Sequence, residues 1–269
     1  MDIEILQTLN RCIEANEPVA LVTVIANTGS SPGKAGAMMS VQSDKRICGT
    51  IGGGNLEFQA IDEAVSCLAS GKSKEVSYAL KPGGDLGMTC GGELRIFIRI
   101  FKAQSQLIIV GGGHIGLELY QLAVHQGFQV TVIDDREEIV SPQRFPHANR
   151  IFTNNIVKTL QEFAISPNSY ITIASRSHDT DRQALEAVVT SNAAYIGMIG
   201  SRNKIRLTLK HLINTGVSRE NVAAVYAPMG LNIASIVPKE IAVSIISEIL
   251  LVKNNGSPQH MRTVKDIEY

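Results

Sequence analysis

The pattern of apolar and polar residues changes near residue 105. Before it, apolar residues at helical spacing predict a helix over 3–14, and a β-branched run predicts a strand over 19–25. The pattern further predicts a hairpin from 37–41 and 46–51, a helix over about 56–70 ended by Gly71, a strand at 76–80, and a half-exposed strand at 93–99. These elements indicate a small α/β layer.

After residue 105, short continuous apolar runs alternate with helical patterns. The expected strands are 107–110, 130–133, 151–153, 170–174, 195–199 and 223–226. Helices are expected at 157–163, at 181–191 with a capping box of Thr180 and Gln183, from about 201 to Gly216, and from Pro238 to Lys253. Continuous apolar strands that alternate with helices are typical of a parallel sheet covered on both faces.

A glycine turn opens this second part. Gly111, Gly113 and Gly116 stand at G-x-G-x-x-G spacing between an apolar run and a helix. The first glycine permits a tight turn, the second lets backbone approach a phosphate, and the third lets the helix pack on the strand. Asp134 comes 18 residues after Gly116, where an acid can bind a ribose hydroxyl. The pattern predicts a nucleotide-binding βαβ unit, and the alternative is a doubly wound domain with an empty crevice.

Two neighbours of this pattern are also candidates for ligand contact. His114 lies inside the turn, where it faces the ligand or only caps the helix. Arg136 follows the acid. We therefore predict the α/β class, with a small N-terminal α/β domain (1–104), a Rossmann-type doubly wound parallel-sheet domain (105–253) and a polar tail (254–269).

Three glycine-rich segments of the N-terminal domain have two interpretations. They cover 28–36 with Ser30 and Ser31, 50–55 with Gly52, Gly53 and Gly54, and 88–92. Glu57 lies in the helical turn after the second segment. Dense glycine indicates a special backbone path or a close ligand. The segments are either three tight loops or one shared pocket for a small anionic ligand, for which 50–55 supplies a cradle of backbone N–H groups.

Cysteine and loop residues supply further candidates. Cys90, which Gly91 and Gly92 follow, is either a soft metal ligand or reactive thiol, or an inert small side chain. Cys12, Cys48 and Cys67 are expected to pack. In the second domain, His178, Asp179 and Asp181 suit metal binding or proton transfer, and the simpler alternative is a helix capped by Thr180 and Asp181 beside a solvated histidine. Ser201, Arg202 and Lys204 form either a phosphate site or a solvated cluster.

Composition narrows the classes of function. The chain has 269 residues, 25 acidic and 25 basic side chains, and no tryptophan. A net charge of zero argues against nucleic-acid and anionic-membrane partners. Because no apolar run approaches the ~20 residues of a membrane span and the N-terminus does not resemble a signal peptide, we expect a cytoplasmic location.

Seven ordered blocks of the chain resemble one family, the XdhC/CoxF (CoxI-like) accessory proteins of molybdenum hydroxylases such as xanthine dehydrogenase. The blocks are Gly29-Ser-Ser-Pro32, Gly49–Gly54 with Glu57, Cys90-Gly-Gly92, Gly111–Gly116 with Asp134-Asp-Arg136, Tyr195–Arg202, Pro228–Ile233 and Pro238–Ser244. The resemblance implies a chaperone without catalysis of its own, which binds molybdenum cofactor, protects it during sulfuration by a cysteine desulfurase and delivers it to the apo-hydroxylase. It also implies self-association as a homodimer.

The resemblance suggests how the candidate residues act together. We expect Gly52–Gly54, Cys90 and the Gly111–Gly116 turn to face one cleft, in which backbone N–H groups hold the cofactor phosphate and Cys90 meets the metal or its sulfur. The Rossmann-type part holds either a nucleotide such as NAD(P) or the nucleotide portion of the cofactor. The alternatives are an NAD(P)-dependent oxidoreductase with His178 as proton donor, and a nucleotide-sensing regulatory module.

Overall fold

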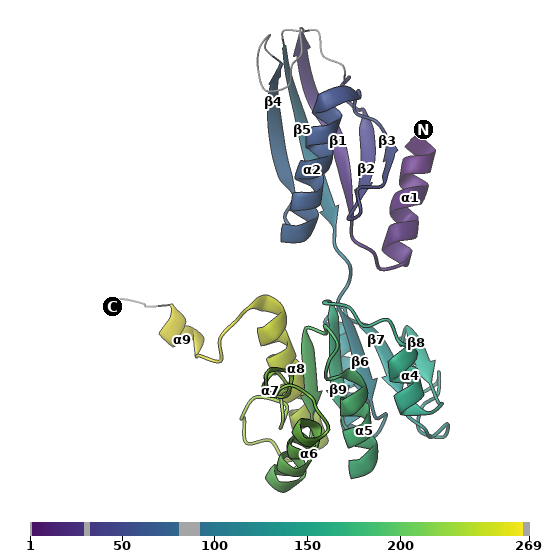
Figure 1. Cartoon of the computed structure of the whole chain (residues 1–269), viewed down its shortest axis with the longest axis vertical. Helices are drawn as coiled ribbons and strands as arrows, with labels where there is room; N and C mark the ends of the chain where they lie inside the picture. The colour runs from purple at the N-terminus through teal and green to yellow at the C-terminus, as the bar shows by residue number, and fades with distance from the viewer. Residues whose placement is uncertain (1, 30–32, 81–91, 266–269) are drawn as a thin grey trace. The chain divides into compact units, whose positions relative to one another are not determined.

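The computed structural model of the chain describes residues 2–29, 33–80 and 92–265. The chain divides into two compact units, Met1–Ala103 and Gln104–Tyr269 (Figure 1). We describe each unit by itself, as the N-terminal and the C-terminal unit.

The N-terminal unit is an antiparallel sheet with a helix on each face. Its strands lie in the order β3-β2-β1-β5-β4, and they are β1 (Val19–Gly29), β2 (Met38–Gln42), β3 (Ile47–Gly49), β4 (Lys74–Leu80) and β5 (Gly92–Phe101). Alternate β1 residues pack on opposite sides: Val22 faces helix α2 (Gly54–Ser70), whereas Val19 faces helix α1 (Asp2–Glu14). The half-exposed strand predicted at 93–99 is confirmed by the alternating burial of β5.

The C-terminal unit is a parallel sheet in the order β10-β9-β6-β7-β8. Its strands are β6 (Gln106–Val110), β7 (Gln129–Ile133), β8 (Arg150–Phe152), β9 (Ser169–Ile173) and β10 (Tyr195–Met198). Its helices are α3 (His114–His125), α4 (Ile156–Glu162), α5 (His178–Val188), α6 (Arg202–Asn214), α7 (Arg219–Ala223), α8 (Pro238–Asn254) and α9 (Met261–Val264). From β6 the strands β7 and β8 are added on one side of the sheet, and β9 and β10 on the other, so the strand order reverses between β6 and β9. Ligands bind at such switch points in open α/β sheets.

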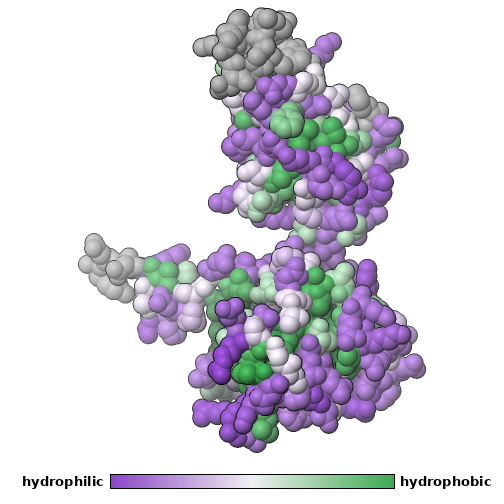
Figure 2. Space-filling model, viewed as in Figure 1, coloured by the Kyte–Doolittle hydropathy of each residue, from purple (hydrophilic) through white to green (hydrophobic). Residues whose placement is uncertain are grey.

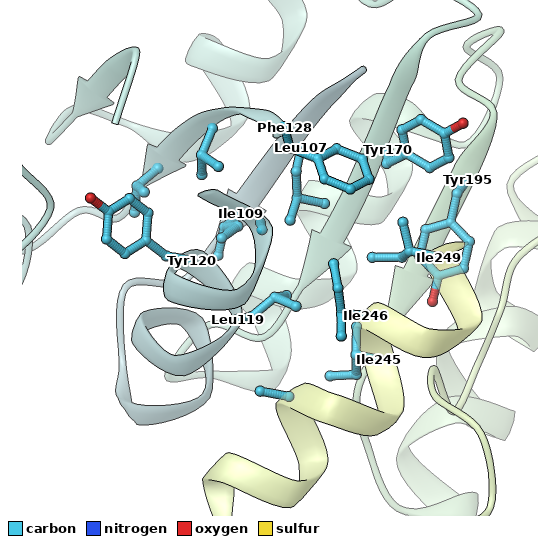
Figure 3. Packing of buried hydrophobic residues seen from close by; sticks show 14 of the residues in the cluster. Leu107, Ile109, Leu119, Tyr120, Phe128, Tyr170, Tyr195, Ile245, Ile246 and Ile249 are labelled. Carbon is cyan, nitrogen blue, oxygen red and sulfur yellow. The ribbon is translucent and has the colours of Figure 1, made fainter. Parts of the chain in front are cut away.

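Both faces of this parallel sheet are buried, as the continuous apolar strands predict. Leu107 and Ile109 of β6 pack with α3 and α8, whereas Ile108 and Val110 pack with α4, α5 and α6. Figure 3 shows the first of these layers, where Leu119 of α3 meets the isoleucines of α8 beneath the strands. The predicted α/β class with a Rossmann-type domain is therefore confirmed.

Two local predictions were wrong. The strand expected at 223–226 is absent: helix α7 ends at Ala223, and within 223–226 Tyr226 alone pairs with the sheet edge, through a bridge to Gly197. Helix α5 begins three residues earlier than expected, because Ser177 accepts the N–H of Thr180 and ends the loop there. The polar tail predicted at 254–269 contains the short helix α9, none of whose residues is buried.

Hydrophilic residues cover most of the visible face of each unit, with apolar side chains in separate patches (Figure 2). Across the described ranges, no helix is both long and apolar enough to cross a bilayer.

Candidate active edge of the parallel sheet

The carboxyl ends of three neighbouring strands meet at one edge of the C-terminal unit. The register pairs Val110 of β6 with Ile133 of β7 on one side and with Ile173 of β9 on the other. The three segments that follow these residues therefore leave the sheet at the same level. They are the glycine turn 111–113, the acidic pair 134–135 and the loop 174–177.

Close packing explains two of the three glycines in the G-x-G-x-x-G motif, Gly111 and Gly116. Gly111 has a φ of 110°, in the region that favours glycine, and a Cβ there would overlap the carbonyl oxygen of Ala174, which follows β9. A Cβ on Gly116 would overlap the carbonyl oxygen of Gly111, so α3 can approach β6 only with glycine there. The turn and the helix are thus positioned by backbone contact.

Gly113, the second glycine of the motif, is different, because a Cβ there would meet none of the described atoms within 4 Å. Gly113 is the N-cap of α3, with a φ of −64° and no side-chain cap in the part of the chain described. Helices α4, α5, α6 and α7 are each capped by a side chain, from Asn155, Ser177, Ser201 and Ser218 respectively. The first turn of α3 contains no acidic residue either. Its backbone N–H groups and the helix dipole are therefore available to an anion.

Asp134 holds the turn from the neighbouring strand. Its side chain is only 2% exposed and accepts the N–H of Gly112 at 2.9 Å, and its two oxygens also accept the backbone N–H, Nε and Nη2 of Arg136 at 3.1, 2.8 and 2.7 Å. Burial alone would raise the pKa of Asp134, but the hydrogen bonds from Arg136 and Gly112 outweigh it and lower the pKa.

These four bonds give Asp134 and Arg136 a structural task at this edge. A carboxylate has about four acceptor positions, and these bonds occupy all of them. A ribose hydroxyl could therefore bind Asp134 only if a bond to the turn or to Arg136 broke. Ribose binding by Asp134 and ligand binding by Arg136 stay predictions. The contacts in the structure show both residues stabilising the glycine turn.

A second buried carboxylate stabilises the loops after β9 and β10. Asp181 of α5 is fully buried, accepts the N–H of Ser175 at 2.8 Å and pairs with Lys204 of α6. The side chain of Lys204 is therefore engaged within the protein. Ser201 caps α6 by accepting the N–H of Lys204, while Arg202 is exposed and forms no ion pair within the described ranges.

Asp181 of the cluster around His178 is engaged within the protein, and the metal-binding and proton-transfer roles of His178 and Asp179 stay predictions. His178 and Asp179 are exposed in the first turn of α5, and Asp179 lies 3.7 Å from Arg182. Among residues 2–29, 33–80 and 92–265, no three His, Cys, Asp or Glu side chains are grouped as a metal site. His114 is likewise exposed, on the first turn of α3.

The glycine turn of the N-terminal unit is occupied by its own acid. One carboxylate oxygen of Glu57 accepts the N–H groups of Ile51 at 3.0 Å and Gly53 at 3.2 Å, together with the hydroxyl of Thr50. The predicted anion cradle exists, but the anion in it is Glu57. Glu57 therefore stabilises the turn that contains Gly52–Gly54 by accepting its N–H groups. Contact between Glu57 and a ligand stays a prediction.

Other predicted residues lie outside the described part of the chain or proved to be packing residues. Ser30, Ser31 and Cys90 belong to the first group, so their ligand roles stay predictions. Cys12 and Cys67 are buried, as expected, and burial is the largest cause that raises the pKa of both thiols.

Sequence reasoning missed one pair of charged residues at this edge. Asp135 lies 3.2 Å from Arg176, at the carboxyl ends of β7 and β9. The pair could have been predicted from its place in the sequence, because both residues closely follow strands that flank the glycine turn. The spacing rule for an acid after the glycine turn pointed to Asp134 instead.

Comparison with known proteins agrees with this architecture. The family model of the XdhC Rossmann domain matches residues 107–249, which is more than half of the chain, and the model of the XdhC and CoxI family matches residues 12–79. A crystal structure of a xanthine dehydrogenase from Bacillus halodurans covers 98% of this chain with a TM-score of 0.53 and 22% identity, and the match covers 99% of that chain. At this identity the likeness is one of fold.

Three curated relatives align with the chain. Uncharacterized protein YqeB of Escherichia coli is 34% identical over 246 residues, which are 90% of this chain and 45% of YqeB. A probable xanthine dehydrogenase subunit of Bacillus subtilis is 30% identical over 58% of this chain and 45% of its own length. Molybdenum cofactor insertion chaperone PaoD of E. coli is 23% identical over 93% of this chain and 88% of its own length.

The chain thus spans less than half the length of the first two relatives and most of the third. With both domain models matched in order and the Rossmann-type sheet in place, the chain belongs to the XdhC and CoxI family.

Proposed function

We propose that this chain is a chaperone that binds molybdenum cofactor and delivers it to a molybdenum hydroxylase of the xanthine dehydrogenase type. The uncapped start of α3 carries the proposal, because it leaves N–H groups for the cofactor phosphate beside a glycine with no described atom near its Cβ position. The names of PaoD and of the B. subtilis relative support the cargo and the recipient.

The residues at this edge have distinct tasks in the proposal. The N–H groups at 113–115 bind the phosphate, and the absence of a side chain on Gly113 lets it approach. Asp134 and Arg136 keep the turn in its bound shape before the cofactor arrives, which lowers the cost of binding. Cys90, which lies outside the described residues, supplies the contact to the metal or its sulfur in this proposal. Protection during sulfuration by a cysteine desulfurase, and a homodimer as the working form, complete the proposal.

The test compares two substitutions at one position. Asn and Asp are both good N-caps, so Gly113→Asn and Gly113→Asp should each keep or raise the unfolding free energy, by up to about 0.5 kcal/mol. Asp also places a carboxylate where the phosphate would bind. We expect Gly113→Asp to lose most of its cofactor, and Gly113→Asn to retain clearly more because it adds no charge.

The measurement uses the full chain purified from a molybdenum-replete host. Molybdenum is counted per chain by mass spectrometry, pterin by fluorescence after oxidation, and delivery by activation of an apo-hydroxylase. Titration with NAD and NADP tests the nucleotide alternative. Wild-type chain that holds neither molybdenum nor pterin, and that does not activate the apo-hydroxylase, would contradict the proposal.

A further inference from the structure

An ion pair crosses the glycine turn. Strand β6 lies between β9 and β7 (Figure 1), and Val110, Ile133 and Ile173 are at the same level. Asp135 follows Ile133 by two residues and Arg176 follows Ile173 by three. Their side chains nevertheless approach to 3.2 Å, although the strands that carry them are not neighbours. Since strands lie about 4.8 Å apart, the pair spans roughly 10 Å above the end of β6.

Arg176 is paired with an exposed carboxylate, whereas Arg136 and Lys204 at the same edge are paired with buried ones. Arg136 is bound through its Nε and Nη2 to buried Asp134, and Lys204 is paired with buried Asp181. The side chain of Arg176 is 58% exposed, and Asp135, its one ion-pair partner in the described ranges, is 38% exposed. Such exposed pairs contribute little stability, so a ligand can replace one partner at small cost.

The backbone beneath Arg176 is anchored on both sides. The N–H of Ser175 is bonded to Asp181, and Ser177 caps α5. The guanidinium can therefore change partners without movement of the loop. A planar guanidinium can bind a phosphate through two parallel hydrogen bonds, whereas its contact with Asp135 is a single bond from Nη2 to Oδ2 at 3.2 Å.

We infer that Arg176 binds the phosphate held at the start of α3, and that Asp135 holds Arg176 across the turn in the free protein. The inference rests on the proposed function, since it assigns a further residue to the same site. Asp135 is thus a competitor of the ligand for Arg176, and its carboxylate turns away from Arg176 when a phosphate binds.

Calorimetric titration of the full chain with inorganic pyrophosphate and with ADP tests the inference. Arg176→Gln should weaken binding of both probes about tenfold, the loss of one charge-assisted contact. Asp135→Asn should strengthen binding of both by about threefold, because it frees Arg176. The double variant should bind like Arg176→Gln, since Asp135 has no effect without its partner.

Arg95→Gln is the matched control. Arg95 forms an exposed pair with Glu75 in the N-terminal unit at 3.1 Å, so the substitution removes the same charge without touching the edge. Wild-type binding that Arg176→Gln leaves unchanged would overturn the role of Arg176 alone. Asp135→Asn that weakens ADP but not pyrophosphate would make Asp135 a ribose ligand and overturn the competition. Wild type that binds neither probe would overturn the phosphate site and Arg176 together.

Discussion

The two glycine-rich turns of this chain place their nearest carboxylates differently. In the N-terminal unit, Glu57 lies in the helix that the turn precedes, and one of its oxygens takes two N–H groups of that turn. In the C-terminal unit, Asp134 comes from the adjacent strand, takes only the N–H of Gly112 within the turn, and is neutralised by Arg136.

The difference decides which turn can bind a ligand anion. The N–H groups around Gly53 already have an anionic partner, whereas those that begin α3 have neither an acid nor a side-chain cap among the described residues. Glycine spacing therefore indicates a backbone that can bind an anion. The position of the nearest carboxylate decides whether that anion is a side chain of the protein or can be a ligand.

Gly116→Ala should have the largest effect on this comparison. Its Cβ would overlap a backbone oxygen, so we expect the free energy of unfolding to fall by about 3 kcal/mol. Gly53→Ala meets no described atom and suffers only from a φ of 76°, so it should cost about 1 kcal/mol. Urea titration followed by circular dichroism measures both, and equal losses would show that the two turns are equally constrained.

Asp134→Asn comes next, with an expected loss of about 2 kcal/mol at neutral pH because Arg136 loses a buried charge partner. The lowered pKa of Asp134 sets the pH dependence: its contribution is complete above the ordinary value of 3.8 and is lost as the pH falls through its folded value. In unfolding measured from pH 7 into acid, the difference between wild type and variant should be constant above 3.8 and shrink progressively below it. A difference that stays constant in acid as well would contradict the ion pair.

Glu57→Ala should have a smaller effect than Asp134→Asn, about 1–2 kcal/mol, since it leaves two N–H groups and a hydroxyl without their partner. The emptied turn should then accept an anion, so sulfate should restore more stability than chloride at equal ionic strength. Thermal unfolding in both salts measures this, with the exposed Glu75→Ala as control. Equal stabilisation of both variants by sulfate would show that the turn does not bind anions.

Much of the fold could be predicted because its signals are local. The apolar run 107–110 is a strand buried on both faces, and Gly71, with a φ of 63°, ends α2 as expected. The failures also have local causes. Ser177, and not Thr180, caps α5, and the strand expected at 223–226 is reduced to a bridge at Tyr226 after the Ser218-capped helix α7, which ends at Ala223.

The glycine turn, most strands and helices and the family resemblance can be predicted from sequence alone, because each is carried by short runs of neighbouring residues. The tasks of the carboxylates depend on tertiary contacts. Asp134 and Arg136 are neighbours in sequence, but the contact of Asp134 with Gly112, and that of Asp135 with Arg176, exist because parallel strands bring residues 22 to 41 positions apart to one edge. Such contacts depend on strand order and register, which no local pattern encodes.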